Sequence, residues 1–125
     1  MKCDVNDLSP KQLNLLIAQA QEYAYMEHGG CIHIYLFDED NEYGEGSWYI
    51  FNPIEDWSDA GELLEMYKPY ISPTSKGIVV EILDEVSSVK SKLGIKYASA
   101  KHPDSIMIAL CRAVVAYHYG YEIEM

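Results

Sequence analysis

The feature that most constrains this sequence is a long acidic segment that contains no basic residue. Between Gln12 and Tyr67 there is no lysine or arginine, and the segment holds twelve of the chain's 20 Asp and Glu residues. The segment therefore carries −12, and the rest of the chain sums to +1, for a net charge of −11. Because these carboxylates have no lysine or arginine nearby in sequence, we expect a solvated acidic face.

This charge excludes some partners and favours others. An anionic surface repels phosphate backbones, so direct nucleic-acid binding is not expected. The same surface attracts cationic proteins and speeds encounter with them. We therefore expect a basic protein partner, and the candidate binding residues are Asp38, Glu39, Asp40, Glu42, Glu45, Glu55, Asp56, Asp59 and Glu62. A face that only maintains solubility is the simpler alternative.

The length of 125 residues predicts a single domain, residues 1–125. No apolar run approaches the roughly 20 residues that cross a membrane, so no membrane partner is expected. The first residues lack a secretory pattern, and three irregularly spaced cysteines make no disulfide framework. We expect a small soluble intracellular protein.

The first half of the chain predicts one helix and two strands. Ser9, Pro10 and Gln12 predict the start of a helix, and we expect Gly29-Gly30 to end it. Cys31 to Phe37 and Ser47 to Phe51 are β-branched and aromatic, which predicts a two-stranded meander around the acidic run 38–46. On the first strand Ile32, Ile34 and Leu36 share one face, while Cys31, His33, Tyr35 and Phe37 share the other.

The second half predicts two or three further helices. A short helix begins at Asp56 and ends before Pro69, and residues 68–76 are predicted to be a connection. The three- and four-residue apolar spacing over 77–93 favours a helix, although residues 78–80 alone would suit a strand.

Residues 95–100 are predicted to form a strand. Asp104 or Ser105 caps a last helix that ends at Gly120, and 121–124 alternates as a terminal strand. Helices interleaved with strands predict a mixed α/β (α+β) fold, a layered helix–sheet–helix sandwich. We expect three to four helices around a small sheet of three to four strands.

Two segments resemble the phage ABA-sandwich family. Residues 52–65 are similar to its Pro…Asp-Trp…Gly…Ile-Ile-Glu signature, and residues 108–124 are similar to its last helix and strand. Tyr97-Ala98 stands where the family has Trp-x-Ala. The chain departs from the family at Ala60-Gly61, where a Gly-Gly pair is usual, at Tyr119, which replaces a Leu, and in the extra helix expected over 78–93.

The resemblance implies a three-layer sandwich from a tailed phage or prophage, in the cytoplasm of a bacterial host, and assigns no activity. For the shared residues it suggests structural roles. We expect Trp57 to anchor its helix in the core and Gly61 to permit close helix-to-sheet packing. Gly120 would form a left-handed helix cap, and Arg112 could pair with one of the many carboxylates.

No motif predicts catalysis, a metal or a cofactor. Cys31, His33, Cys111 and His118 would suit zinc if they met in space, but no Cys-x-x-Cys pair accompanies them, and buried cysteines with hydrogen-bonded histidines are the commoner arrangement. The acidic run 38–44 has Tyr43 where a calcium loop needs glycine.

The leading functional prediction is a non-enzymatic accessory protein that binds and inhibits a basic host protein such as a defence nuclease. One alternative is a small-molecule binder that sequesters a nucleotide immune signal, with a pocket made by Lys96, Arg112, Tyr117, Tyr119 and Tyr121. The other alternative is a structural or virion-associated module. The sequence is also compatible with a homo-oligomer.

Overall fold

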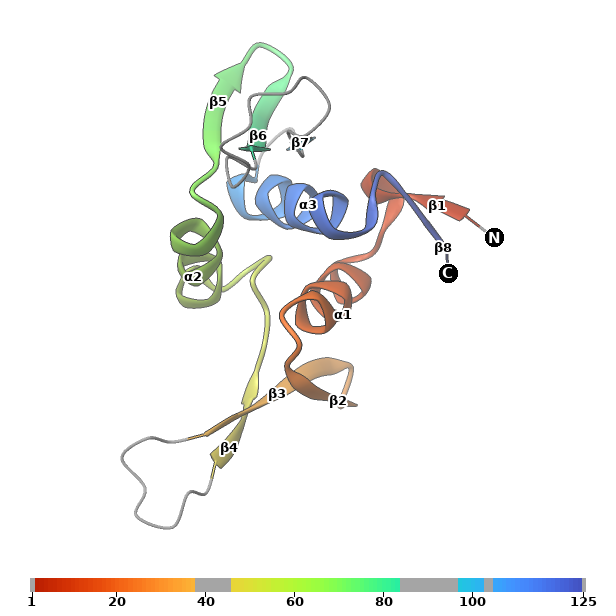
Figure 1. Ribbon diagram of the computed structural model, residues 1–125, viewed down its shortest axis with the longest axis vertical. Helices are drawn as coiled ribbons and strands as arrows, with labels where there is room; N and C mark the ends of the chain where they lie inside the picture. Colours follow the sequence, from red (N-terminus) through yellow and green to blue (C-terminus); the bar gives the residue numbers. More distant parts are fainter. Residues whose placement is uncertain (1, 38–45, 84–96, 103–104, 125) are drawn as a thin grey trace, which may run out of the picture.

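The computed structural model describes residues 2–37, 46–83, 97–102 and 105–124 (Figure 1). Helix α3 (Ile106–Tyr119) lies at the centre of the hydrophobic core. Its residues Ala109 to Cys111 and Ala113 to Ala116 are all buried. Successive helical residues point in different directions, so a helix buried over such a run must be covered on all sides.

Two kinds of element cover α3. On one side lies an antiparallel sheet of β5 (Tyr70–Thr74), β6 (Gly77–Leu83) and β7 (Tyr97–His102), in that order. On the other side lie α1 (Pro10–Ala20) and α2 (Trp57–Tyr67), as Figure 1 shows. The sheet contributes buried Val80, Ile82 and Ala100 to the shared core.

A second antiparallel sheet packs against α1 on the side away from α3 (Figure 1). Its strands are β2 (Ala24–His28), β3 (Cys31–Phe37) and β4 (Gly46–Ile50). A two-stranded ribbon of β1 (Lys2–Asp4) and β8 (Glu122–Glu124) joins the two ends of the chain, and the 3-10 helix η1 (Val5–Asp7) follows β1.

The predicted helix starts are confirmed. Ser9 Oγ accepts from the Gln12 N–H, and Gln12 Oε1 accepts from the Ser9 N–H, which completes a capping box at α1. Asp56 caps α2, which ends before Pro69 as predicted. Ser105 is the cap of α3, with its hydroxyl accepting from the Ile108 N–H.

The predicted end of α3 is confirmed as well. Gly120 has φ 86° and ψ 179°, a combination that only glycine adopts readily but that differs from the left-handed helical conformation expected for this cap. The chain then enters β8, which matches the predicted terminal strand. The mixed α/β class is also confirmed, with the described strands divided among three small antiparallel sheets. The helix–sheet–helix layering stays a prediction.

The prediction that the first helix runs to Gly29-Gly30 is wrong. Helix α1 ends at Ala20, and residues 24–28 form β2, which pairs with β3. Gly29 and Gly30 have φ values of 62° and 78° and form the two-residue loop between these strands. Two-residue hairpin loops favour positive φ at both positions because their twist then matches that of the strands, so the glycines turn a hairpin.

The predicted connection over 68–76 and the predicted helix over 77–93 are also corrected. Residues 70–74 form β5 and residues 77–83 form β6, and the rest of the expected helix lies outside the described residues. The β-branched side chains of Ile78, Val79 and Val80 suit a strand, and pairing with both β5 and β7 outweighs the helical spacing.

Two roles expected from the resemblance are wrong. Trp57 does not anchor α2 in the core, because 57% of its surface is exposed at the first turn of the helix. Gly61 does not permit a close approach, because a Cβ atom there would meet nothing within 4 Å. Inward positions of α2 are instead filled by buried Ala60 and Leu63.

Two glycine-to-alanine substitutions should act in opposite directions. Gly30→Ala should destabilise the protein by about 1 kcal/mol, because alanine is strained at positive φ even where space is open. Gly61→Ala should stabilise it by about 0.5–1 kcal/mol, because alanine is the better residue inside a helix. Denaturant unfolding of both variants measures this difference, and a Gly61→Ala variant less stable than wild type would contradict it.

Candidate functional site

Asn52 joins α1, the end of β4 and the start of α2 through five hydrogen bonds. Its backbone N–H donates to Asp59 Oδ2 at 2.9 Å, and its carbonyl accepts from the N–H groups of Glu55 (3.1 Å) and Asp56 (2.8 Å). Its side-chain amide donates to Glu55 Oε2 at 3.3 Å and accepts from Asn14 Nδ2 at 3.0 Å. This residue therefore fixes the position of the acids around it.

Four of the predicted binding acids lie in the turn before α2 and in its first two turns. Glu55, Asp56 and Glu62 are exposed, and Asp59 is half-buried. Helix N-termini favour negative charge, because the first N–H groups lack helical partners and the helix dipole is positive there. We call Glu55, Asp56, Asp59 and Glu62 the α2 acids. The predicted acids Asp38, Glu39, Asp40, Glu42 and Glu45 lie outside the described residues.

Among the α2 acids, Asp59 has a pKa raised by its surroundings. Burial raises the pKa of Asp59, the Asn52 N–H that it accepts lowers it, and the neighbouring Asp56 carboxylate raises it, with a net rise above the ordinary value. Tyr23 lies close enough that, after burial, the charges of Glu62 and Asp59 raise its pKa too. The Asp56 and Asp59 carboxylates thus repel each other, and Glu62 and Asp59 both lie near Tyr23.

The sheet of β2, β3 and β4 has one face that no described element covers. Residues opposite each other in an antiparallel pair share a face, so the register places Met26 and Ile50 beside His33, and Trp48 beside Tyr35. The opposite face of the sheet carries Ile32 and Ile34, which are buried near α1. We call the uncovered set the outer face; it consists of Met26, His33, Tyr35, Phe37, Trp48 and Ile50.

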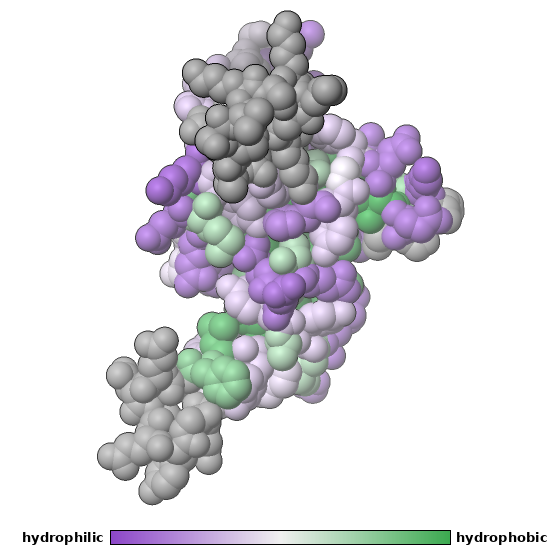
Figure 2. Space-filling model, viewed as in Figure 1, coloured by the Kyte–Doolittle hydropathy of each residue, from purple (hydrophilic) through white to green (hydrophobic). Residues whose placement is uncertain are grey.

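The outer face is strongly apolar for a surface. Phe37 is 73% exposed, Ile50 58% and Trp48 47%. Tyr35 packs edge-on against both Phe37 and Trp48, with ring centroids 5.4 Å and 5.3 Å apart, and its hydroxyl accepts from the Gly46 N–H. Figure 2 shows apolar surface over this end of the molecule. Contiguous exposed apolar surface of this kind marks interaction sites.

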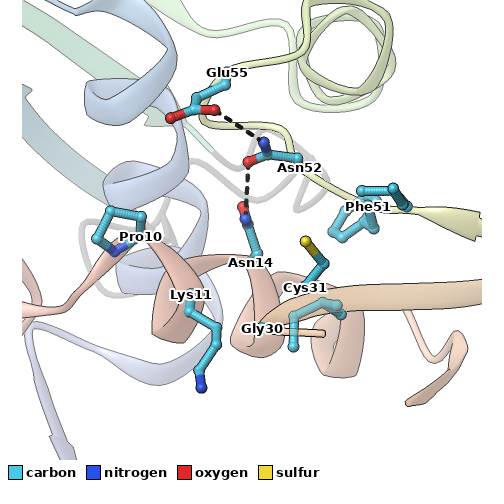
Figure 3. A pocket seen from close by; sticks show the side chains of 10 residues that line it. Pro10, Lys11, Asn14, Gly30, Cys31, Phe51, Asn52 and Glu55 are labelled. Atoms are coloured by element: carbon cyan, nitrogen blue, oxygen red, sulfur yellow. Dashed lines mark hydrogen bonds between the residues drawn. The ribbon is translucent and has the colours of Figure 1, made fainter. Parts of the chain in front are cut away.

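A pocket of about 200 Å³ lies between the outer face and the α2 acids. It is an open pocket lined by α1, the start of β3, the end of β4 and the turn before α2 (Figure 3). Its polar lining comes from Lys11, Asn14, Asn52 and Glu55, and its apolar lining from Pro10, Gly30, Cys31, Ile32, Ile50 and Phe51. Ile50 belongs also to the outer face, and Glu55 to the α2 acids, so the three features are continuous.

The structure does not bring together the residues predicted for a nucleotide pocket. Arg112 Nη1 donates to the Lys101 carbonyl at 2.8 Å, where a carboxylate partner was expected, and the buried Arg112 Nε has no hydrogen-bond partner. Tyr119 lines a pocket of about 430 Å³ and Tyr121 a different one of about 250 Å³, and Arg112 lines neither.

The ring of His118 packs against those of both Tyr117 and Tyr119. Tyr117 packs edge-on against Tyr67 with ring centroids 5.7 Å apart, between α3 and α2. Lys96 lies outside the described residues.

The four residues considered for zinc do not form one cluster. Cys111 is fully buried on α3, whereas Cys31 is exposed at the start of β3. His118 Nε2 lies 2.5 Å from the Tyr67 hydroxyl, which also accepts from Gln21 Nε2, so these side chains tie the three helices together. The described part of the chain contains no group of three or more His, Cys, Asp or Glu side chains that could hold a metal ion.

Sequence reasoning missed Asn14 and Asn52. Asn14 is 7% exposed, and it is the only polar side chain classed as buried among the described residues. It lies three and four positions before buried Ile17 and Ala18, so a polar residue interrupts the inward stripe of α1. That interruption was the available signal. Asn52 has no local pattern that marks it, and its partner Asn14 lies 38 positions earlier in the sequence.

The chain matches no protein-family model, and no curated protein is similar to it in sequence. The resemblance to the phage ABA-sandwich family therefore stays a prediction. Among the helices in the described residues, none has the length and apolar character needed to cross a membrane.

Asp59→Asn should stabilise the protein at neutral pH. A carboxyl whose pKa is raised on folding stabilises the folded state while protonated, and this contribution is lost as pH rises through the folded-state pKa. Asparagine keeps an acceptor for the Asn52 N–H without the charge. We expect a gain below about 1 kcal/mol, because the site is partly solvated. Thermal unfolding from pH 3 to 8 measures it; equal effects at both ends of that range would contradict the assignment.

The three cysteines should react with a thiol reagent in a fixed order. Cys31 is exposed, Cys3 is half-buried and Cys111 is buried, and burial raises the pKa of the Cys111 thiol, which suppresses the reactive thiolate. We expect Cys31 to be labelled first and Cys111 only after unfolding, as measured by mass spectrometry of digested samples. Labelling of Cys111 in the native protein at the rate of Cys31 would refute this placement.

Proposed function

We propose that this chain is a non-enzymatic accessory protein that binds and inhibits a basic host protein of a nucleic-acid-binding class. The observation that carries the proposal is the continuity of the α2 acids with the apolar outer face, within a segment that has no lysine or arginine. Protein interfaces combine a desolvated apolar and aromatic centre with a polar rim. The outer face would supply the apolar and aromatic centre, and the α2 acids would supply part of the polar rim.

Charge supports a cationic partner. Of the described α2 acids, none has a lysine or arginine within its own segment to neutralise it. Burial is the main cause of the raised pKa of Asp59, and the nearby Asp56 carboxylate raises it further. A cationic partner would offset that repulsion, so the ionised acids would stabilise the bound complex. Exposed aromatic rings add a second attraction for lysine and arginine, since cations are drawn to ring faces.

The resemblance to the phage family supports the remaining parts of the proposal. It suggests a phage or prophage origin, a layered sandwich and a place in the cytoplasm of a bacterial host, where defence nucleases present basic grooves to nucleic acids. Carboxylates bound in such a groove would compete with phosphates for the same lysine and arginine side chains. Inhibition of a nuclease would then follow from occupancy alone.

Capture from bacterial extract with an immobilised full-length chain tests the proposal. We expect a basic protein to be retained at low salt and released as salt rises, because counterions screen the attraction. A double substitution Asp56→Lys and Glu62→Lys should weaken retention by at least about tenfold and flatten the salt dependence. Phe37→Ser with Trp48→Ser should weaken it without changing the salt dependence.

The matched control is Glu122→Lys with Asp7→Lys, which changes the net charge equally at exposed residues near the β1–β8 ribbon. This control should leave retention within about twofold of wild type if location matters beyond net charge. Equal loss in both charge variants, or retention of acidic proteins only, would contradict the proposal.

A further inference from the structure

The hydrogen-bond directions around Asn52 follow from one carboxylate. Glu55 can only accept, so the Asn52 group that faces it must be the amide NH₂, and Asn52 Oδ1 then faces Asn14. Asn52 Oδ1 in turn requires a donor, so Asn14 presents its own NH₂ to it. This chain, drawn with dashed lines in Figure 3, leaves Asn14 Oδ1 as the free end.

Asn14 Oδ1 is buried and has no hydrogen-bond partner. Asn14 is more than nine-tenths buried and lines the pocket between α1 and the turn before α2. Leaving a buried acceptor unsatisfied is unfavourable, so a donor that reaches it from the pocket gains by supplying the missing bond. One wall of the pocket thus includes a residue with a buried acceptor that no protein group satisfies.

The charges around the pocket favour a positively charged donor. Glu55 contributes a carboxylate at the rim. The other charged lining residue is Lys11, whose ammonium is paired with Glu27 Oε1 at 2.6 Å and extends away from Asn14 in Figure 3. The Lys11–Glu27 ion pair has no net charge, so the Glu55 carboxylate makes the charge around the pocket negative.

The size and walls of the pocket limit the ligand further. A volume of about 200 Å³ is below the roughly 300–1,000 Å³ of pockets that hold drug-sized ligands. Pro10, Ile50 and Phe51 offer apolar walls for an aliphatic stem. One side-chain end fits this description better than a nucleotide does.

The geometry points to a receptor pocket for a single guanidinium or ammonium group, which would donate to Asn14 Oδ1 and to the Glu55 carboxylate. In the proposed function this group is an arginine or lysine side chain of the basic partner, so this part of the inference rests on that proposal. A guanidinium has five donors in a planar fork, which lets it meet both acceptors at once.

The test is a titration of the isotope-labelled full-length chain with Nα-acetyl-arginine methylamide, followed by NMR at the side-chain amides of Asn14 and Asn52. We expect saturable shifts of both signals. The citrulline analogue has nearly the same shape but no charge, and it should bind at least about tenfold more weakly, because charge-assisted hydrogen bonds are the stronger ones. Alkylation of Cys31, which lines the pocket, should slow at least threefold when the arginine compound saturates it, since occupancy would block access.

Matched charge variants separate the pocket from general attraction. Glu55→Gln keeps an acceptor for Asn52 and removes the charge, so the arginine compound should bind about tenfold more weakly. Glu65→Gln removes the same charge from an exposed residue of α2 outside the pocket, and binding should stay within about twofold. Unshifted Asn14 and Asn52 signals, equal binding of citrulline, or equal effects of the two variants would each overturn the inference.

Two further arms identify the source of the group. A short arginine peptide that binds at least as tightly as the blocked amino acid supports a protein side chain, whereas binding of spermidine with exclusion of the peptide supports a free polyamine. Binding of the blocked arginine with no basic protein retained from extract would reject the proposed function and keep the pocket. Retention of a basic protein that is unchanged by Glu55→Gln would keep the proposed function and reject the pocket as the place where the partner's side chain binds.

Discussion

The fold depends on the burial of α3 on all its sides. A helix with residues 109–111 and 113–116 buried needs cover around its full circumference, and no single sheet or helix supplies that. The β5–β6–β7 sheet covers one side, and α1 and α2 cover the other. The small residues Ala109, Ala113 and Ala116 let these elements approach closely. The β2–β3–β4 sheet is one layer further out, so only one of its faces contributes to the core.

That position explains why the outer face is open. Its strands are held by α1 from one side, through Ile32 and Ile34, and the opposite side chains have no described neighbour to pack on. A sheet with aromatic side chains on its solvent side gains stability from cross-strand pairs such as Tyr35 and Trp48. The same pairs leave flat ring surface available for a partner.

Local signals in the sequence predicted the helices well. Ser9, Asp56 and Ser105 form caps within three residues of their partners, so a short stretch of sequence contains the whole interaction. Strands β2 and β6 were missed because the residues before Gly29-Gly30 were assigned to the first helix and the apolar spacing over 77–93 fits a helix, although β2 pairs with the adjacent β3 and β5 with the adjacent β6. Gly29-Gly30 suits both a helix end and a hairpin loop, and only pairing of residues 24–28 with β3 decides between them.

The candidate site was predictable in charge but not in geometry. The acidic segment is plain in the sequence, and the cap at Asp56 placed the α2 acids at a helix start. The pocket depends on Asn14, Asn52 and Glu55 meeting across 38 and three positions, and no local pattern encodes that meeting. Exposure of Trp57 was misjudged for the same reason, since burial is decided by which elements pack beside it.

The β1–β8 ribbon has a consequence for the order of folding. Its register joins Lys2 to Glu124, almost the full span of the chain, so its contacts have the greatest sequence separation of any strand pair described. Closing so large a loop is entropically unfavourable until the intervening core has formed. The ribbon should therefore assemble late and open first, and amide exchange there would precede exchange in α3.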